Sequence, residues 1–185
     1  VGLIKDLKKI QSHSFSKIES QILVIGKTFG HLDQSVFANQ LHNLHEGMPP
    51  EVNLRNEKNN GEIILKLINL GLVNSVHDVS TGGIILALAE MSISSQIGVK
   101  IHKPEKLSNL FEYFFGEDQS RYIIEVDTNN YSKVEKVLKD NNIYFDNIGV
   151  TQEENFELDK DLKINVKELY DINNKWYNEY NGLNN

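Results

Sequence analysis

Two kinds of apolar pattern alternate along this chain. Short apolar runs, such as QILVI ended by a glycine at 21–26, are typical of buried strands. Between them, apolar residues recur three and four positions apart, as amphipathic helices require. The pattern predicts strands over 21–26, 72–79, 97–101, 120–126 and 143–151, with shorter strand pieces near 156–158 and 162–164. It predicts helices over 35–42, 57–70, 82–94, within 105–115, over 129–141 and from 166 or 167 onward, before a polar tail at 178–185 that is expected to fray.

The segment 82–94, GGIILALAEMSIS, is apolar on nearly every side. Such a helix has to be buried, because it has no polar face to turn toward water. Helices on both faces of a mixed sheet meet that requirement. We therefore predict an α+β fold with α/β/α layers around a mixed sheet, in which the β-α-β portion over 119–151 is half of a ferredoxin-like unit. The proline-containing stretch 46–56 is predicted to be a connector.

The composition is that of a globular protein, and it narrows the range of partners. Of the 185 residues, 39% are hydrophobic and 24% are charged, as expected for one compact domain. The net charge of −7 and the scattered lysines argue against nucleic acid and anionic membrane as partners. The absence of cysteine excludes disulfides and thiolate chemistry. No apolar stretch approaches the roughly 20 residues that span a bilayer, and a cytoplasmic location is expected.

The stretch HDVSTGG joins a predicted strand to the apolar helix. Ser80 or Thr81 is expected to cap that helix, while Gly82 and Gly83 leave room for a ligand or another backbone segment. Because the first N–H groups of a helix lack partners within it, they favour an anion such as a phosphate or a carboxylate. A capped, tightly packed turn without a ligand is the alternative, and the spacing alone slightly favours it.

The histidines form no metal-binding pattern. His77 and Asp78 alternate along a strand, so at most one of them should face a given site. We expect them to be cleft or interface residues rather than an acid–base pair. His42 and His45 lie three residues apart on a predicted helix, but no third ligand accompanies them, and no metal site is predicted.

A second polar cluster, FFGEDQSR at 114–121, lies at the beginning of a predicted strand. Polar side chains at such a place can line a cleft, whereas a solvated turn with an Arg–carboxylate pair is the alternative. The candidate ligand-binding residues of this cluster are Glu117, Gln119 and Arg121. The glycine-containing loop at 26–35 is a weaker candidate. Its polar side chains that could contact an anion are Lys27, Thr28, His31 and Ser35.

Three segments, taken in order, closely resemble the C-terminal domain of the aminoimidazole ribonucleotide synthetase superfamily. They are LVIGKTFGHLDQS, GLVNSVHDVSTGGIILALAEM and FGEDQSRYIIEV. The resemblance covers almost the whole chain and is closest to the amidine-forming branch, whose members carry two units of one N-domain and one C-domain. It implies that 21–185 are the second C-domain. Residues 1–20 would then be a terminal segment that continues the last strand of a preceding N-domain, so the chain is expected to be a fragment.

The sequence departs from the family pattern at three places. Asp118 stands where the family usually has Ser, Ser120 stands where it usually has Gly, and LDQS at 32–35 replaces Leu-Gly-Gly-Ser. These departures weaken the case for tight ligand contact in this copy. Glu117 and Gln119 match substrate-contacting residues of the first C-domain in position only. The resemblance therefore implies no catalytic residue here, and a role as the pseudo-symmetric partner.

The activity implied by the resemblance is that of a ligase of de novo purine biosynthesis. ATP would phosphorylate a formamide oxygen, and ammonia from a glutaminase subunit would displace the phosphate. ATP and Mg²⁺ would be bound mainly by N-domains that this chain lacks, so the chain alone is expected to be inactive. The implied partners are the preceding N-domain, the first C-domain, the glutaminase subunit and a small accessory subunit. Two alternatives stay open: another ATP-dependent member, such as aminoimidazole ribonucleotide synthetase or selenophosphate synthetase, and a non-catalytic structural or oligomerisation domain.

Overall fold

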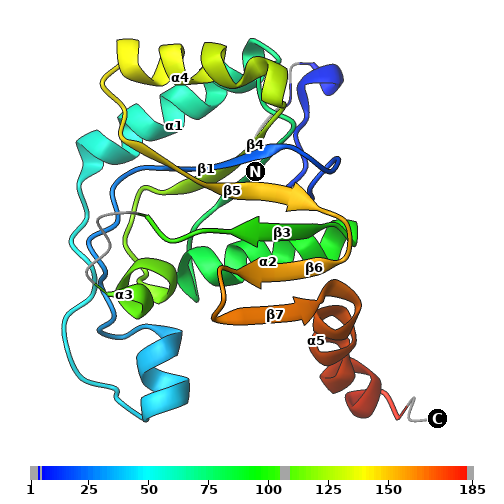
Figure 1. The fold of residues 1–185 in the computed structure, drawn as a ribbon. Helices are drawn as coiled ribbons and strands as arrows, with labels where there is room; N and C mark the ends of the chain where they lie inside the picture. Colours follow the sequence, from blue (N-terminus) through cyan, green and yellow to red (C-terminus); the bar gives the residue numbers. More distant parts are fainter. Residues whose placement is uncertain (1–3, 5, 105–108, 183–185) are drawn as a thin grey trace.

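The structure is a computed structural model that describes residues 4, 6–104 and 109–182 (Figure 1). The strands are β1 (Gln21–Ile25), β2 (Ser75–Asp78), β3 (Gly98–Ile101), β4 (Tyr122–Val126), β5 (Phe145–Gln152), β6 (Asn155–Leu158) and β7 (Leu162–Asn165). The α-helices are α1 (Leu54–Asn69), α2 (Gly83–Ser95), α3 (Leu110–Phe115), α4 (Tyr131–Asp140) and α5 (Val166–Tyr180). Shorter helical turns are η1 (Leu7–Lys9), η2 (Phe37–Leu41) and η3 (Thr128–Asn130).

The seven strands form one mixed sheet in the order β2-β4-β1-β5-β3-β6-β7. Neighbouring strands run antiparallel, except that β3 and β6 are parallel. The central strand β1 lies between β4 and β5, which α4 connects. This arrangement is the split β-α-β unit of ferredoxin-like folds, and it confirms that part of the prediction.

Helices cover both faces of the sheet, because successive side chains of a strand point to opposite faces. Ile22 and Val24 of β1 pack with α2, α3 and the start of α5. Leu23 and Ile25 pack with α1 and α4, which lie together on one side of the sheet in Figure 1. The predicted α/β/α layering is thus confirmed. Since the chain has a buried core on each face of its own sheet, we expect it to fold by itself.

The apolar helix α2 is buried, as its sequence predicts. Ile84, Leu88 and Met91 have no exposed surface, and Leu86 alone among its large apolar residues is exposed. The helix contacts α3 and α5 as well as the sheet. It is therefore surrounded by other elements on most sides, which explains why it lacks a polar face. No helix in the described part of the chain is long and apolar enough to cross a membrane.

Several predicted boundaries differ from those observed. Helix α1 begins at Leu54 rather than at 57, because the Asn53 side chain accepts a hydrogen bond from the Asn56 N–H at 3.0 Å and caps it. Strand β2 is half as long as predicted, and the predicted helix at 35–42 contains the wide turn η2. The helix predicted within 105–115 is observed as α3, while 105–108 lie outside the described residues.

The two ends of the chain also differ from prediction. The segment resembling a last N-domain strand contains the helical turn η1, and its residues 1–3 and 5 lie outside the described ones. Helix α5 continues through Tyr180, three residues into the tail expected to fray, and 183–185 lie outside the described residues. Between these ends, Ser12 forms a parallel bridge with Ser75, and Phe15 is buried in the core. The second half of 1–20 thus packs against the domain, and the boundary at residue 20 stays a prediction.

Candidate functional site

Three segments converge where β4 begins: the loop after β1, the turn before α2, and residues 116–121. Arg121 links the first and last of these. Its side chain is fully buried, and its nitrogens donate to the carbonyl oxygens of Asp118 (3.1 Å) and Gly116 (2.6 Å) and to the Thr28 hydroxyl (3.2 Å). Burial lowers the pKa of Arg121, while the nearby Asp118 carboxylate opposes that shift. Arg121 therefore fixes the backbone of the site and faces away from solvent.

The side chain of Asp118 accepts hydrogen bonds from three consecutive backbone N–H groups. One carboxylate oxygen lies 3.0 Å from the nitrogen of Phe29 and 2.9 Å from that of Gly30, and the other lies 3.3 Å from that of His31. The loop can present all three groups because Gly30 has φ of +82° and lies against Glu112, where a Cβ would overlap. The Asp118 side chain is almost fully buried, and its nearer oxygen lies 3.9 Å from Arg121.

The side chain of Glu117 joins the other two segments. One of its oxygens accepts from the N–H groups of Val36 and Gly82, each at 2.8 Å. The Gly82 N–H lies at the N-terminus of α2, where an anion is favoured. The negative group at this helix terminus is thus a carboxylate of the chain itself.

The turn before α2 differs from prediction at its cap. Gly82, with φ of +78°, is the N-cap residue, so the helix has no cap from the side chain of its own N-cap residue. The expected cap residues, Ser80 and Thr81, are exposed. Two glycines are needed because Gly82 is left-handed and because α3 ends directly against Gly83, where a Cβ would lie 2.7 Å from the carbonyl oxygens of Phe114 and Gly116. The left-handed backbone accounts for Gly82, and close packing of α3 against α2 accounts for Gly83.

A cavity of about 680 Å³ opens beside this junction. Of the predicted ligand-binding residues, Gln119 lines it, together with Asp118 and His31, whereas Ser80, Thr81, Gly82, Gly83, Glu117 and Arg121 do not.

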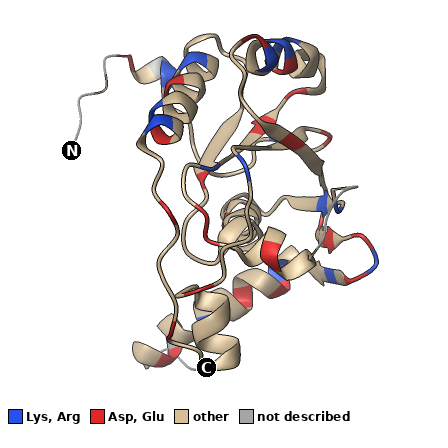
Figure 2. Ribbon diagram, turned by 90° about the vertical axis from the view of Figure 1, so that its left-hand side faces the viewer, with Lys and Arg blue, Asp and Glu red and all other residues tan. Residues whose placement is uncertain are grey.

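The wall of this cavity carries four carboxylates and no Lys or Arg. Residues 28–54, which supply much of the wall, contain no Lys or Arg at all. In Figure 2 the connector that leads to α1 likewise carries acidic segments only. The carboxylates on the wall are Asp33, Glu51, Glu112 and Asp118.

This cavity does not fit a nucleoside triphosphate with Mg²⁺. Phosphates are ordinarily held by Lys, Arg and free backbone N–H groups. The wall has no Lys or Arg, and beside it the Gly30 N–H, the Gly82 N–H and Arg121 already bind Asp118, Glu117 and a backbone carbonyl. Among the described residues, no three of His, Asp and Glu are arranged to hold a metal ion. This cavity therefore has no phosphate clamp, and the described part of the chain has no metal-ligand cluster.

His77 and Asp78 lie elsewhere, in a second cavity of about 460 Å³ between β2 and α2. His77 Nε2 lies 2.9 Å from a Glu90 oxygen, and His77 Nδ1 lies 3.4 Å from an Asp78 oxygen. The expectation that at most one of the two faces a site is wrong. Because β2 is an edge strand and Asp78 is its last residue, no neighbouring strand separates the two side chains there.

The remaining candidates of the loop after β1 have structural contacts. Ser35 is buried, and its hydroxyl accepts from the Ala38 N–H. Lys27 lies over the Tyr144 ring. His42 packs on the Phe37 ring, and His45 contacts the Asn43 side chain.

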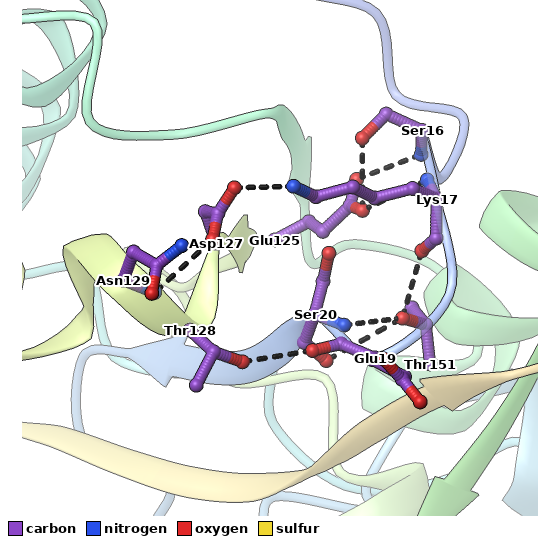
Figure 3. A network of polar contacts seen from close by, with 9 residues as sticks. All are labelled: Ser16, Lys17, Glu19, Ser20, Glu125, Asp127, Thr128, Asn129 and Thr151. Carbon is purple, nitrogen blue, oxygen red and sulfur yellow. Dashed lines mark hydrogen bonds and ion pairs between the residues drawn. The ribbon is translucent and has the colours of Figure 1, made fainter.

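A buried carboxylate that was not predicted is Glu125 in β4 (Figure 3). Its two oxygens accept from the Ser16 N–H (2.8 Å), the Ser16 hydroxyl (2.9 Å), the Lys17 N–H (3.2 Å) and the Ser75 hydroxyl (2.9 Å). A buried carboxylate needs such a set of donors. Glu125 therefore attaches the segment before β1 to the sheet. The only signal in the sequence is a charged residue at an inward position of the apolar strand YIIEV.

An exposed ion pair beside Glu125 is expected to make stability depend on pH. The Lys17 ammonium, and then the Asn129 N–H, lower the pKa of Asp127. A carboxyl whose pKa is lower in the folded state stabilises the fold above its unfolded pKa, and that contribution is lost as the pH falls through the folded value. The substitution Lys17→Met should therefore raise the pKa of Asp127 and destabilise the chain at pH 7, but not at pH 2. Urea unfolding across this range and an NMR titration of Asp127 measure both.

Lys136→Met, which breaks an exposed pair with Asp140, is the matched control and should leave the pKa of Asp127 unchanged. If the difference in stability between Lys17→Met and the wild type were the same at pH 2 and pH 7, the ion pair would not be its source.

Together these features define an α/β/α domain built on a split β-α-β unit, with a cavity beside the beginning of β4. Residues 17–160 match the protein family described as "AIR synthase related protein, C-terminal domain". The chain belongs to this family.

Among curated relatives, the chain is 46% identical over 180 residues to a phosphoribosylformylglycinamidine synthase subunit PurL of Pelagibacter ubique. It is 36% identical over 180 residues to the subunit of that name from Rhodopseudomonas palustris. Each match covers 97% of this chain but only 25% and 24% of the relative. The chain thus spans about a quarter of the length of these relatives.

Solved structures share the fold at low sequence identity. The structure described as "T. maritima PurL complexed with FGAR" matches with a TM-score of 0.70 and 18% identity, over 89% of this chain and 30% of that one. A thiamine-monophosphate kinase from Stenotrophomonas maltophilia matches with a TM-score of 0.54 and 13% identity, over 80% of this chain and 52% of that one. The layered α+β fold is therefore common to proteins of different names.

Proposed function

We propose that this chain is the C-terminal domain of a phosphoribosylformylglycinamidine synthase, the ligase that converts formylglycinamide ribonucleotide to formylglycinamidine ribonucleotide. The observation that carries the proposal is the 46% identity to the Pelagibacter ubique PurL subunit along 97% of the chain. A match at this identity along nearly all of this chain favours this branch over the thiamine-monophosphate kinase, which is 13% identical to the chain.

Within the ligase, the domain acts as a frame and supplies no catalytic residue. The groups nearest its cavity support this role: Arg121 binds backbone carbonyls, and Glu117 and Asp118 bind backbone N–H groups. ATP and Mg²⁺ are bound by parts of the polypeptide outside this chain, and the 185 residues alone are inactive. Gln119, whose side chain is exposed, is the one member of the predicted ligand-binding set that lines the cavity.

The proposed partners are the other domains of the same polypeptide, a glutaminase subunit and a small accessory subunit. A neighbour described as "Structure of PurLQS from Thermotoga maritima" supports a multi-subunit assembly. The enzyme is placed in the cytoplasm, where purine biosynthesis takes place.

A chimera tests the proposal. The matching 180 residues of the Pelagibacter ubique subunit are replaced by this chain, and ammonia-dependent formation of the amidine is measured in the purified protein. We expect the chimera to keep activity within about tenfold of the parent. That factor corresponds to an increase of about 1.4 kcal/mol in the activation free energy. The isolated chain should show none.

A second chimera carrying Gly83→Trp is the control, because α3 leaves no room for any side chain there, and it should be inactive. A folded first chimera without activity, or activity of the isolated chain, would contradict the proposal.

A further inference from the structure

Three consecutive backbone N–H groups on the wall of the 680 Å³ cavity point to one carboxylate. Consecutive N–H groups that point to one spot bind anions in many proteins. Here those of Phe29, Gly30 and His31 point to the Asp118 carboxylate, with nitrogen–oxygen distances of 2.9 to 3.3 Å. Arg121 lies behind the carboxylate, 3.9 Å away. The donors that an external phosphate or carboxylate would need are all present, and a side chain occupies them.

The surroundings of Asp118 make this occupation hard to reverse. The carboxylate is held in place by its own backbone, because the Asp118 carbonyl accepts from Arg121 Nε and the Glu117 N–H donates to the His31 carbonyl. A tethered group of this kind competes at a high effective concentration. Three more carboxylates and no Lys or Arg line the cavity in front of it, so an incoming anion is repelled before it reaches the N–H groups.

We propose that Asp118 is a built-in occupant of an anion-binding site, and that it closes the cavity to phosphate and carboxylate ligands. The cavity then accepts neutral or cationic groups, for which Gln119 and the acidic wall are suited. This inference goes beyond the proposed function and does not depend on it, because it concerns binding to the 185-residue chain itself.

The test is chemical rescue by small anions. In Asp118→Ala the three N–H groups and Arg121 lose their carboxylate, so formate, acetate or inorganic phosphate should bind in its place. An anion at ten times its dissociation constant should raise the Tm of the variant by about 3–6 °C, measured against chloride at equal ionic strength. NMR should show saturable shifts of the Gly30 and His31 amides in the variant. In the wild type, the same anions should produce neither effect.

Glu51→Ala is the matched control, since Glu51 lies on the same cavity wall but is exposed. Like the wild type, this variant should show neither a rise in Tm nor saturable amide shifts when the anions are added. If Asp118→Ala is unfolded, recovery of the fold on adding formate is the expected result, and Asp118→Ser is then titrated in the same way.

Two results would overturn the inference. One is saturable binding of phosphate at the Gly30 and His31 amides of the wild type. The other is a folded Asp118→Ala or Asp118→Ser variant that no anion stabilises more than it stabilises Glu51→Ala.

Discussion

Replacing Glu125 by glutamine should destabilise the chain by about 2–4 kcal/mol, because the carboxylate accepts four hydrogen bonds and an amide has only one oxygen to accept them. Each carboxylate oxygen binds one backbone N–H and one serine hydroxyl. In either orientation of the amide, its NH₂ group faces the backbone N–H of Ser16 or Lys17. Both groups are then donors, because a backbone N–H cannot accept a hydrogen bond. The free energy of unfolding from urea titration measures the effect.

Amide hydrogen exchange shows which part of the chain is destabilised in Glu125→Gln. Since Glu125 attaches the segment before β1 to the sheet, the amides of Ser16 and Lys17 should exchange faster in Glu125→Gln than in the wild type. Glu135→Gln, which removes one partner of an exposed pair with Lys139 on α4, is the control and should cost less than about 1 kcal/mol. Equal stability of Glu125→Gln and the wild type would show that the carboxylate contributes nothing.

The substitution Gly83→Ala should destabilise the chain by about 2–5 kcal/mol. A left-handed conformation costs an alanine about 1–2 kcal/mol, and overpacking adds about 1–3 kcal/mol. Both apply at Gly83, where φ is +72° and the new Cβ would lie 2.7 Å from two backbone carbonyl oxygens. Since the neighbours are backbone atoms, the start of α2 and the end of α3 have to move apart, which also strains the Glu117 contact to Gly82.

Gly71→Ala separates the two contributions. Gly71 also has a positive φ, +65°, but nothing lies within 4 Å of its Cβ position. It should therefore lose only the conformational part, about 1–2 kcal/mol. Thermal and urea unfolding of both variants test the difference, and a Gly83→Ala variant no less stable than Gly71→Ala would contradict the close packing of α2 and α3.

The fold could be predicted because its signals are local. The runs QILVI and YIIEV carry apolar residues on both faces, as expected of strands covered by helices on both sides, and β1 and β4 coincide with them. The all-apolar helix 82–94 required burial, and α2 is buried. Strand order was not predicted, since pairings such as β1 with β4 and β5 join residues far apart in the sequence.

The candidate site was less predictable, because its contacts are made by backbone groups. Asp118 and Glu117 bind N–H groups of residues 29, 30, 31, 36 and 82, and a backbone N–H leaves no trace in the residue type that carries it. The same holds for Glu125, two of whose four donors are backbone N–H groups more than 100 residues away. The sequence marks 114–121 as a polar cluster, but nothing in it indicates that the carboxylates of this cluster bind the backbone N–H groups nearby.

The position of β1 in the middle of the sheet has a consequence for synthesis of the protein. The ribosome makes Gln21–Ile25 well before the strands on its two sides, which begin at Tyr122 and Phe145. At about 5–20 residues per second, this apolar segment waits roughly 5–20 s for its first partner strand. During that time both edges of β1 are unpaired and open to pairing with other chains, so rapid translation or a chaperone would limit aggregation before β4 is made.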